Sequence, residues 1–269
     1  MLWLLQDNFV DSMSGRMAFD GMTSRMAFTL RNRGRELHGF SLVPGEPLPE
    51  LPLSPTEPHF FYGSTGLAQR LLGEPEWAHG VFLHKDSLDQ RVWLANRSKD
   101  MLNPTCEVMT LAELERNTPT APFFVRPVLV AKAFAGQVVR DRNLSGLYRA
   151  RRGIMKELEP DLLVAVSPLQ EIEAEYRFVV YRHQVVTGSR YRLGGKLSLS
   201  AEIPAEVLAG ANALAAGWLP HEFIVMDVAR VAGGKLCVIE FNSVHSSGLY
   251  DVPLGQYIEA VERAVRERS

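Results

Sequence analysis

The chain has 269 residues, of which 46% are hydrophobic, and a formal net charge of −2 at pH 7. These values allow a sizeable core in one large domain or in two to three small lobes. They exclude a strongly basic surface, so nucleic acid is not expected as an obligatory partner. No stretch is long and apolar enough to cross a membrane. The cysteines, Cys106 and Cys237, fit no metal-site spacing, and we expect a reduced, cytoplasmic setting.

The N-terminal third predicts an α/β lobe without a recognisable motif. Residues 2–5 are expected to form a buried strand rather than part of a signal peptide, because no basic segment precedes them and Asp7 follows closely. Residues 14–19 and 23–28 form a near-repeat, SGRMAF and TSRMAF. We interpret the two arginines of this repeat as surface residues without a chemical role.

A proline-rich stretch over residues 44–58 predicts an irregular connection between the early strands. Residues 60–66, FFYGSTG, predict a strand that runs into a turn and the start of a helix, which in a Rossmann-like lobe can face a ligand. Further on, Thr110 and Glu113 predict a capping box at the start of a short helix over 111–117.

From residue 122 onwards, cations accompany the predicted strands. Arg126 stands at a strand end and Lys132 follows it, with Gly136 just beyond, so the two charges could lie beside a triphosphate. The alternative is a pair of surface cations that flank a hairpin. Residues 140–156 are dense in arginine and predict either a solvated segment or a cationic patch for an acidic substrate.

Two predicted strands that follow residue 171 carry charged residues at alternate positions. Glu175 and Arg177 share one face of the first strand, and Arg190 and Arg192 share one face of the second. Charges that face inward from a sheet are unfavourable unless they bind an anion or pair with each other. The pattern therefore predicts a cleft for phosphate or for a substrate carboxylate.

The chemistry is most specific in a predicted β-hairpin over residues 223–241 that turns at Gly233–Gly234. Glu240 and Asn242 are two residues apart and point to the same face, and Asp227 lies in the facing strand. Two carboxylates and a carboxamide form an all-oxygen ligand set that suits Mg²⁺ together with substrate phosphates. The alternative, solvated charges at the edge of the hairpin, fits the apolar neighbours of Glu240 less well.

This acceptor pattern resembles the Mg²⁺-binding hairpin of the ATP-grasp fold, as in D-alanine–D-alanine ligases. Residues 245–250 resemble the small-residue loop that follows the hairpin in that family. Arg126-Pro127 falls where many ATP-grasp ligases have Lys-Pro. The Arg-Pro pair with the following Lys132-x-Phe-x-Gly136 stretch is similar to a small clade of ATP-grasp proteins known from phage and bacterial genomes.

The resemblance implies ATP and Mg²⁺ as cofactors and assigns roles to individual residues. The implied metal ligands are Asp227, Glu240 and Asn242. The implied nucleotide-binding residues are Arg126 and Lys132 at the phosphates, Ser167 and Leu169 at the adenine edge, Glu171 at the ribose, and Glu175. The implied catalytic residues are Lys132, Arg177 and Arg190, with either arginine at an acylphosphate.

The implied architecture is an α/β ATP-grasp fold with an N-terminal lobe over 1–120 and two nucleotide-clamping lobes over about 121–170 and 171–269. The implied activity is that of a carboxylate–amine ligase, in which ATP activates a small-molecule or peptide carboxylate as an acylphosphate and an amine then displaces phosphate. Two alternatives stay open: phosphoryl transfer without amide formation, and a non-catalytic nucleotide-binding module. The sequence does not reveal the acid, the amine or the oligomeric state.

Overall fold

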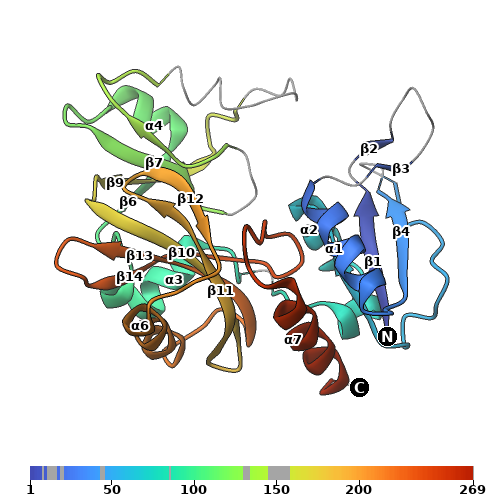
Figure 1. Cartoon of the computed structure of the whole chain (residues 1–269). Coiled ribbons are helices and arrows are strands. Elements are labelled where there is room, and N and C mark those ends of the chain that lie inside the picture. The colour runs from blue at the N-terminus through green and yellow to red at the C-terminus, as the bar shows by residue number, and fades with distance from the viewer. Residues whose placement is uncertain are drawn as a thin grey trace.

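Three β-sheets and one short hairpin organise the described part of the chain (Figure 1). The computed structural model describes residues 1–7, 9–10, 17–18, 21–42, 46–84, 86–129, 134–144 and 158–268. The mixture of parallel sheet, antiparallel sheet and helices confirms the predicted α/β class. Within these ranges, every helix falls short of the length or the hydropathy that a bilayer-spanning segment needs.

The N-terminal lobe is a three-stranded parallel sheet with helices on both faces, in the strand order β4-β1-β5. Trp3 and Leu5 of β1 pack towards α1, whereas Leu4 packs on the other face towards α2 and η1. The elements of this lobe are β1 (Leu2–Asp7), β2 (Phe9–Val10), β3 (Met17–Ala18), α1 (Gly21–Asn32), β4 (Leu37–Ser41), β5 (His59–Tyr62), α2 (Thr65–Leu71) and η1 (Pro75–Gly80).

A four-stranded antiparallel sheet of strand order β6-β9-β7-β8 forms the second lobe. Its elements are β6 (Glu107–Thr110), α4 (Leu111–Arg116), β7 (Phe123–Pro127), β8 (Gln137–Val139) and β9 (Leu163–Pro168). The predicted capping box of Thr110 and Glu113 is present at the start of α4. Both β6 and α4 precede the predicted lobe boundary at residue 120, yet β6 pairs with β9 and Leu114 of α4 enters the core of this lobe.

A five-stranded antiparallel sheet of strand order β12-β11-β10-β13-β14 forms the third lobe. The elements of this lobe are α3 (Gln90–Arg97), η2 (Ser98–Asp100), β10 (Ile172–Tyr181), β11 (Gln184–Leu193), β12 (Lys196–Ser200), α6 (Ala205–Ala215), β13 (Phe223–Val231) and β14 (Leu236–Asn242). The predicted hairpin is confirmed: β13 and β14 are adjacent, and Gly233 and Gly234 between them both have positive φ. One face of the sheet packs on α6 through Phe178, Ile224 and Met226.

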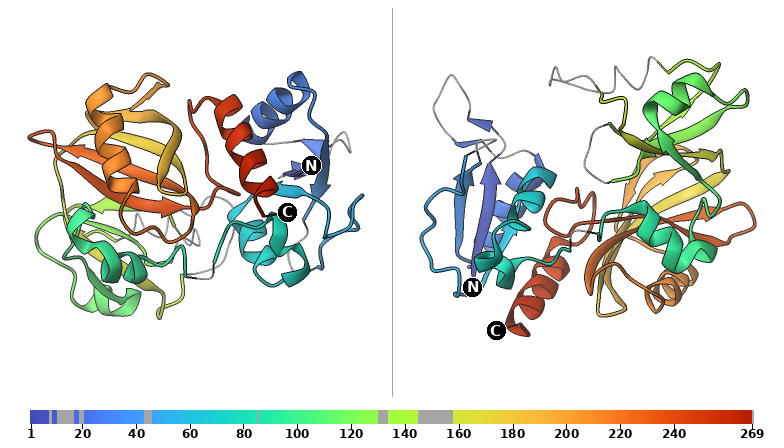
Figure 2. Two further views of the ribbon diagram at one scale, coloured as in Figure 1. Left: turned by 90° about the horizontal axis from the view of Figure 1, so that it is seen from below. Right: turned by 180° about the vertical axis from the view of Figure 1, so that it is seen from behind.

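The C-terminal helix α7 (Leu254–Arg266) joins the third lobe to the N-terminal lobe. Tyr257, Ile258 and Val261 of this helix share one apolar core with Trp3 of β1 and Val225 of β13. Seen from below and from behind, α7 lies between the N-terminal sheet and the five-stranded sheet (Figure 2). The end of the chain therefore completes a core that its beginning starts.

His245, in the loop that follows β14, connects the same two lobes through hydrogen bonds. Its Nδ1 lies 2.7 Å from the carbonyl oxygen of Phe61, and its Nε2 lies 2.8 Å from the backbone nitrogen of Phe82. The backbone N–H can only donate, so Nε2 accepts and Nδ1 carries the proton. The ring is fully buried and stacks on Phe60 with ring centroids 4.6 Å apart. His245 is therefore a neutral side chain that fixes the loop to the N-terminal lobe.

We expect His245→Ala to lower the free energy of unfolding by about 3 kcal/mol or more, because it removes a buried ring and leaves the Phe82 N–H without its acceptor. Urea unfolding followed by circular dichroism measures this change. His38→Ala, at a half-buried position of β4, is the matched control and should cost less than about 1 kcal/mol. Equal effects of the two substitutions would contradict the connecting role of His245.

Buried histidines also predict how stability depends on pH. Burial lowers the pKa of His245 to about 4 and that of His221 to about 3. The unfolded chain, whose histidines have a pKa near 6.5, therefore binds more protons below that pH, so stability is fully present above about pH 6.5 and is lost as the pH falls towards 4.

We expect each of the two histidines to contribute a loss of about 2 kcal/mol between about pH 7 and about pH 5. Urea unfolding at the two pH values gives the total loss. His245→Asn should make the dependence shallower, because asparagine does not titrate in this range. A slope that is unchanged in the variant would show that other groups cause the loss.

Candidate functional site

One face of the five-stranded sheet changes from apolar to polar along its strands. On β10, Val179 and Tyr181 belong to the core under α7, whereas Glu175 and Arg177 occupy the preceding alternate positions. On β13 the same change occurs at Asp227, which stands directly opposite Arg177. The strand period thus places an apolar anchor and a charged site on the same face of one sheet.

The structure brings the three predicted metal ligands together at this polar end. Asp227 pairs directly with Glu240 across the hairpin, and Asn242 stands two positions further along β14. The Asn242 Nδ2 atom lies 2.9 Å from Glu240 Oε1 and 3.5 Å from Asp227 Oδ2. The amide therefore lies between the two carboxylates.

Arg177 holds Asp227 through a bidentate ion pair. Its Nε lies 2.8 Å from Asp227 Oδ1, and its Nη2 lies 2.6 Å from Asp227 Oδ2. Its Nη1 donates to the carbonyl oxygen of Gly248 in the loop after β14. Arg177 and Asp227 are 7% and 2% exposed, so each supplies the partner that the other needs at that depth.

Arg126 brings the four-stranded sheet to the site. Its Nη2 lies 2.6 Å from Glu240 Oε2, and its guanidinium carbon lies 5.7 Å from the centre of the Trp93 ring. Arg126 comes from β7, whereas Glu240 comes from β14, so this ion pair connects the second lobe to the third. The predicted cation is thus at the site, with a carboxylate as its partner.

The two carboxylates respond differently to their common environment. Burial raises the pKa of Asp227 to about 6 against the opposing effect of Arg177, and the adjacent Glu240 contributes to the rise. Burial also acts on Glu240, but Arg126 and the Asn242 amide outweigh it and lower the pKa of that carboxyl group. Asp227 is therefore the carboxylate that is more difficult to keep ionised, and it depends on its cation.

Two tyrosines that the sequence analysis missed surround the Arg177 guanidinium. The rings of Tyr191 and Tyr250 stack with centroids 4.7 Å apart and an interplanar angle of 11°. The Arg177 guanidinium carbon lies 4.8 Å from the Tyr250 ring centre and 5.8 Å from that of Tyr191. Tyr250 has a positive φ of 47°, which is uncommon for a residue other than glycine.

The expectation that Arg190 and Arg192 share a face is wrong, because β11 contains a bulge at this point. Arg192 stands opposite Glu175, but Arg190 stands opposite Tyr176, the next residue of β10. Arg192 Nη1 lies 3.2 Å from Glu175 Oε1 on the polar face. Arg190 shares the face of Tyr176, towards α6, and its Nη2 lies 3.2 Å from Ser198 Oγ. The structure therefore does not bring Arg190 to the cluster of Asp227 and Arg177.

The remaining predicted nucleotide contacts occupy the connection between the second and third lobes. Ser167 is buried near the end of β9, opposite Phe124. Leu169 is 38% exposed and Glu171 is also exposed, in the segment between β9 and β10. Lys132 lies outside the described residues.

The side chains at the hairpin suit Mg²⁺ in chemistry and position. Within the described ranges, no group of three or more His, Cys, Asp and Glu side chains is arranged to hold a metal, so the set depends on Asn242 as its third member. The Asn242 amide nitrogen donates to both carboxylates, and reversing that amide would present its oxygen instead. Arg126 and Arg177 occupy the remaining carboxylate positions, so a metal ion would compete with them for Asp227 and Glu240.

Comparisons with known proteins agree with this geometry. The model of an ATP-grasp domain family, described as family 2 of its clade, matches residues 103–260. A search of curated proteins found no significant match.

Solved structures with a similar fold cover the whole chain. D-cycloserine synthetase DcsG is 14% identical with a TM-score of 0.58, and 100% of this chain and 99% of that chain are covered. D-alanine–D-alanine ligase from Bacillus anthracis is 14% identical with a TM-score of 0.57, with 100% of each chain covered. A RimK domain ATP-grasp protein from Sphaerobacter thermophilus is 16% identical with a TM-score of 0.55, with 100% and 99% covered. At these identities the similarity concerns the fold.

We expect Arg177→Met to lower the free energy of unfolding by about 3–5 kcal/mol, because it leaves the Asp227 carboxylate buried without a cation. Urea unfolding measures the loss. The double variant Arg177→Met with Asp227→Leu should recover most of it, since no unpaired charge remains. If the double variant is less stable than the single one by the full cost of Asp227→Leu alone, the two residues do not act as a pair.

Proposed function

The chain belongs to this clade family of ATP-grasp domains, and from this membership we propose that it is an ATP- and Mg²⁺-dependent carboxylate–amine ligase that forms ADP. The observation that carries the proposal is the convergence of Asp227, Glu240 and Asn242 at the polar end of one sheet face, with Arg126 and Arg177 beside them. Family membership alone gives the nucleotide-binding fold; these side chains supply the means to act on a phosphate.

The proposed roles follow from where the side chains lie. Asp227, Glu240 and Asn242 would hold Mg²⁺, which when bound would neutralise oxygens of the transferring phosphoryl group. Arg126 lies beside Glu240 and is proposed for the nucleotide phosphates, as is Lys132. Ser167, Leu169 and Glu171 are proposed for adenine and ribose because they lie in the segment that links two lobes, and Glu175 completes the nucleotide set.

Arg177 is proposed as the arginine that contacts the acylphosphate. Of the two arginines considered for this role, Arg177 lies on the polar face, whereas Arg190 lies on the opposite face of the sheet. The rings of Tyr191 and Tyr250 hold its guanidinium from the side, which limits its movement when Asp227 binds another cation. Its contribution is positioning and charge stabilisation rather than proton transfer.

The proposed reaction has two balanced steps. A carboxylate oxygen of the acid attacks the γ-phosphorus of ATP, the bond from that phosphorus to the β–γ bridging oxygen breaks, and ADP leaves. The amine nitrogen then attacks the acyl carbon, the bond from that carbon to the phosphate oxygen breaks, and inorganic phosphate leaves. Carboxylate, ATP and ammonium thus give amide, ADP, phosphate and one proton. Neither step requires a covalent nucleophile from the protein.

One observation favours the alternative of a non-catalytic or merely phosphoryl-transferring nucleotide-binding module. Both carboxylates of the hairpin are already paired with guanidinium groups, so the cluster is complete as an ion-pair network without a metal. We propose the ligase as the first candidate, acting on small-molecule or peptide substrates in a reducing, cytoplasmic setting. The described cysteines, Cys106 and Cys237, are both free thiols, which fits such a setting.

We expect calorimetric titration to show Mg²⁺-dependent binding of ATP to the wild type and at least about tenfold weaker binding to Asp227→Asn with Glu240→Gln, because two charged ligands are lost. The control is Asp161→Asn with Glu206→Gln, which removes the same two charges from exposed positions. Circular dichroism must show that each variant is folded. A folded wild type that binds no Mg²⁺–ATP would overturn the ligase and the module alike.

Hydroxylamine separates the ligase from its alternative once ATP binding is established. A ligase forms an acylphosphate, and hydroxylamine converts that intermediate to a hydroxamate, so a screen of carboxylic acids should yield one that gives hydroxamate and ADP together. A kinase of another acceptor releases ADP without hydroxamate. A module does neither, whatever acid is present.

A further inference from the structure

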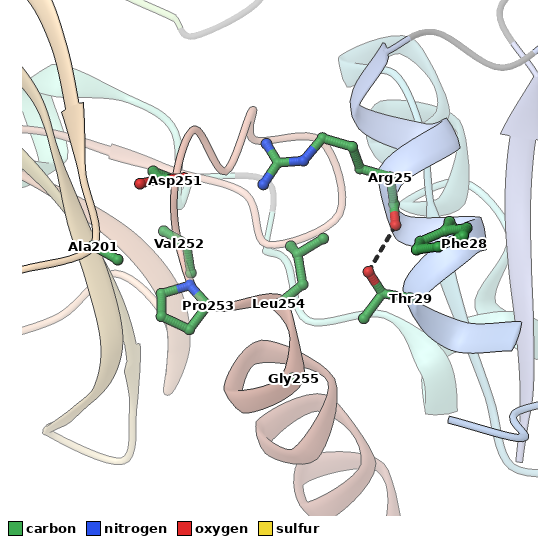
Figure 3. Close-up of a pocket in the computed structure, with 9 residues that line it drawn as sticks. All are labelled: Arg25, Phe28, Thr29, Ala201, Asp251, Val252, Pro253, Leu254 and Gly255. Carbon is green, nitrogen blue, oxygen red and sulfur yellow. Dashed lines mark hydrogen bonds between the residues drawn. The ribbon is translucent and has the colours of Figure 1, made fainter. Parts of the chain in front are cut away.

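A pocket of about 380 Å³ lies next to the metal-ligand cluster, between the N-terminal and third lobes (Figure 3). Arg25, Phe28 and Thr29 of α1 form one wall, Ala201 after β12 forms another, and residues 251–255, which lead into α7, form the floor. The floor begins directly after Tyr250, whose ring faces Arg177. One residue therefore separates this pocket from the charged cluster.

Arg25 supplies the positive charge of the pocket. Figure 3 shows its guanidinium extending from α1 towards the segment that contains Asp251. Its Nη1 donates to the carbonyl oxygen of Tyr250, which holds the guanidinium in place. Its Nε and Nη2 make no hydrogen bond with a described residue, so they remain available to an anion.

The other polar feature of the pocket is the Asp251 carboxylate. It is exposed and makes no hydrogen bond or ion pair with any described residue, Arg25 included. The pocket also presents apolar surface: Phe28 is 67% exposed, and Pro253 and Leu254 line the floor. One cation, one anion and an apolar surface complement a ligand that carries both charges and a hydrocarbon group.

We propose that this pocket binds the amine substrate of the ligase and that this substrate is an α-amino acid with an apolar side chain. Its carboxylate pairs with Arg25, its amino group donates to Asp251, and its side chain packs on Phe28 and Leu254. The assignment rests on the proposed function, because only a ligase needs an acceptor amine beside the nucleotide site. Arg25, which the sequence analysis interprets as a surface residue, becomes a substrate-binding residue.

Ligand-observed NMR titration of L- and D-alanine, leucine and phenylalanine tests the pocket, with Mg²⁺ and a non-hydrolysable ATP analogue bound to the full chain. We expect Arg25→Gln and Asp251→Asn each to weaken binding of the best amino acid by about tenfold, the effect of one charge-assisted hydrogen bond. Arg31→Gln, at an exposed arginine on the same helix, is the matched control and should leave binding unchanged. Arg25→Lys keeps the charge and should retain part of the affinity.

Analogues assign each charge to its partner. The amide of the best amino acid lacks the carboxylate, so its binding should be weak in the wild type and should not weaken further in Arg25→Gln. The corresponding carboxylic acid lacks the amino group and should be insensitive to Asp251→Asn. Sensitivities that are reversed, or equal for both analogues, would overturn the orientation and with it the site as proposed.

Failure of the pocket and failure of the proposed function give different results. If Mg²⁺–ATP binds but no amino acid of the panel does, or if both variants bind amino acids like the wild type, the pocket assignment is wrong and the ligase proposal stands. If the folded wild type binds no Mg²⁺–ATP, the proposed function is overturned, and the acceptor role of the pocket is overturned with it. Melting temperatures close to that of the wild type confirm that the variants are folded.

Discussion

Two carboxylates that face each other across a buried hairpin set a condition that much of the structure meets. Asp227 and Glu240 are directly paired in β13 and β14, where their like charges repel and water is largely excluded. Such a pair is stable only if cations or hydrogen-bond donors balance it. Arg177 balances Asp227 from within the sheet, Arg126 balances Glu240 from the second lobe, and Asn242 donates to both carboxylates. The arrangement of two lobes thus depends on where these two charges lie.

The loop after β14 carries the same dependence to the N-terminal lobe. Arg177 holds the loop at the carbonyl oxygen of Gly248, Arg25 holds it at that of Tyr250, and Tyr62 donates to the carbonyl oxygen of Ser247 over 2.7 Å. His245 adds its two hydrogen bonds to the strand and loop of the N-terminal lobe. Because α7 begins a few residues later, the loop also determines how the C-terminal helix enters the shared core.

Strand alternation explains why the centre of the site could be predicted from the sequence. Glu240 and Asn242 had to share a face because side chains in a strand alternate with a period of two, and the Gly-Gly turn placed Asp227 opposite. Lobe membership was less accessible, because strand pairing over long sequence separations leaves no local signal. Glu107–Thr110 joins a sheet whose other strands all follow residue 120.

The residues that sequence reasoning missed owe their roles to tertiary contacts or to local irregularity. Arg25 looks like any surface arginine until α1 is placed against the loop that begins α7. Tyr250 belongs to the loop that the resemblance identified, but its stacking partner comes from another strand. Tyr191 lay between two arginines that alternation assigned to the cleft, and the bulge reversed that assignment.

The bulge in β11 makes the aromatic side of the site depend on residue count rather than residue type. Two residues of β11 occupy the length of one residue of β10 at this point, and this extra residue turns Tyr191 towards Arg177. A chain shorter by one residue here would form a regular ladder and exchange the two faces, so that a guanidinium would replace the phenol beside Arg177. Two neighbouring guanidinium groups would then repel each other over the same pair of carboxylates. For this strand, alignment gaps between relatives would therefore carry more chemical information than substitutions do.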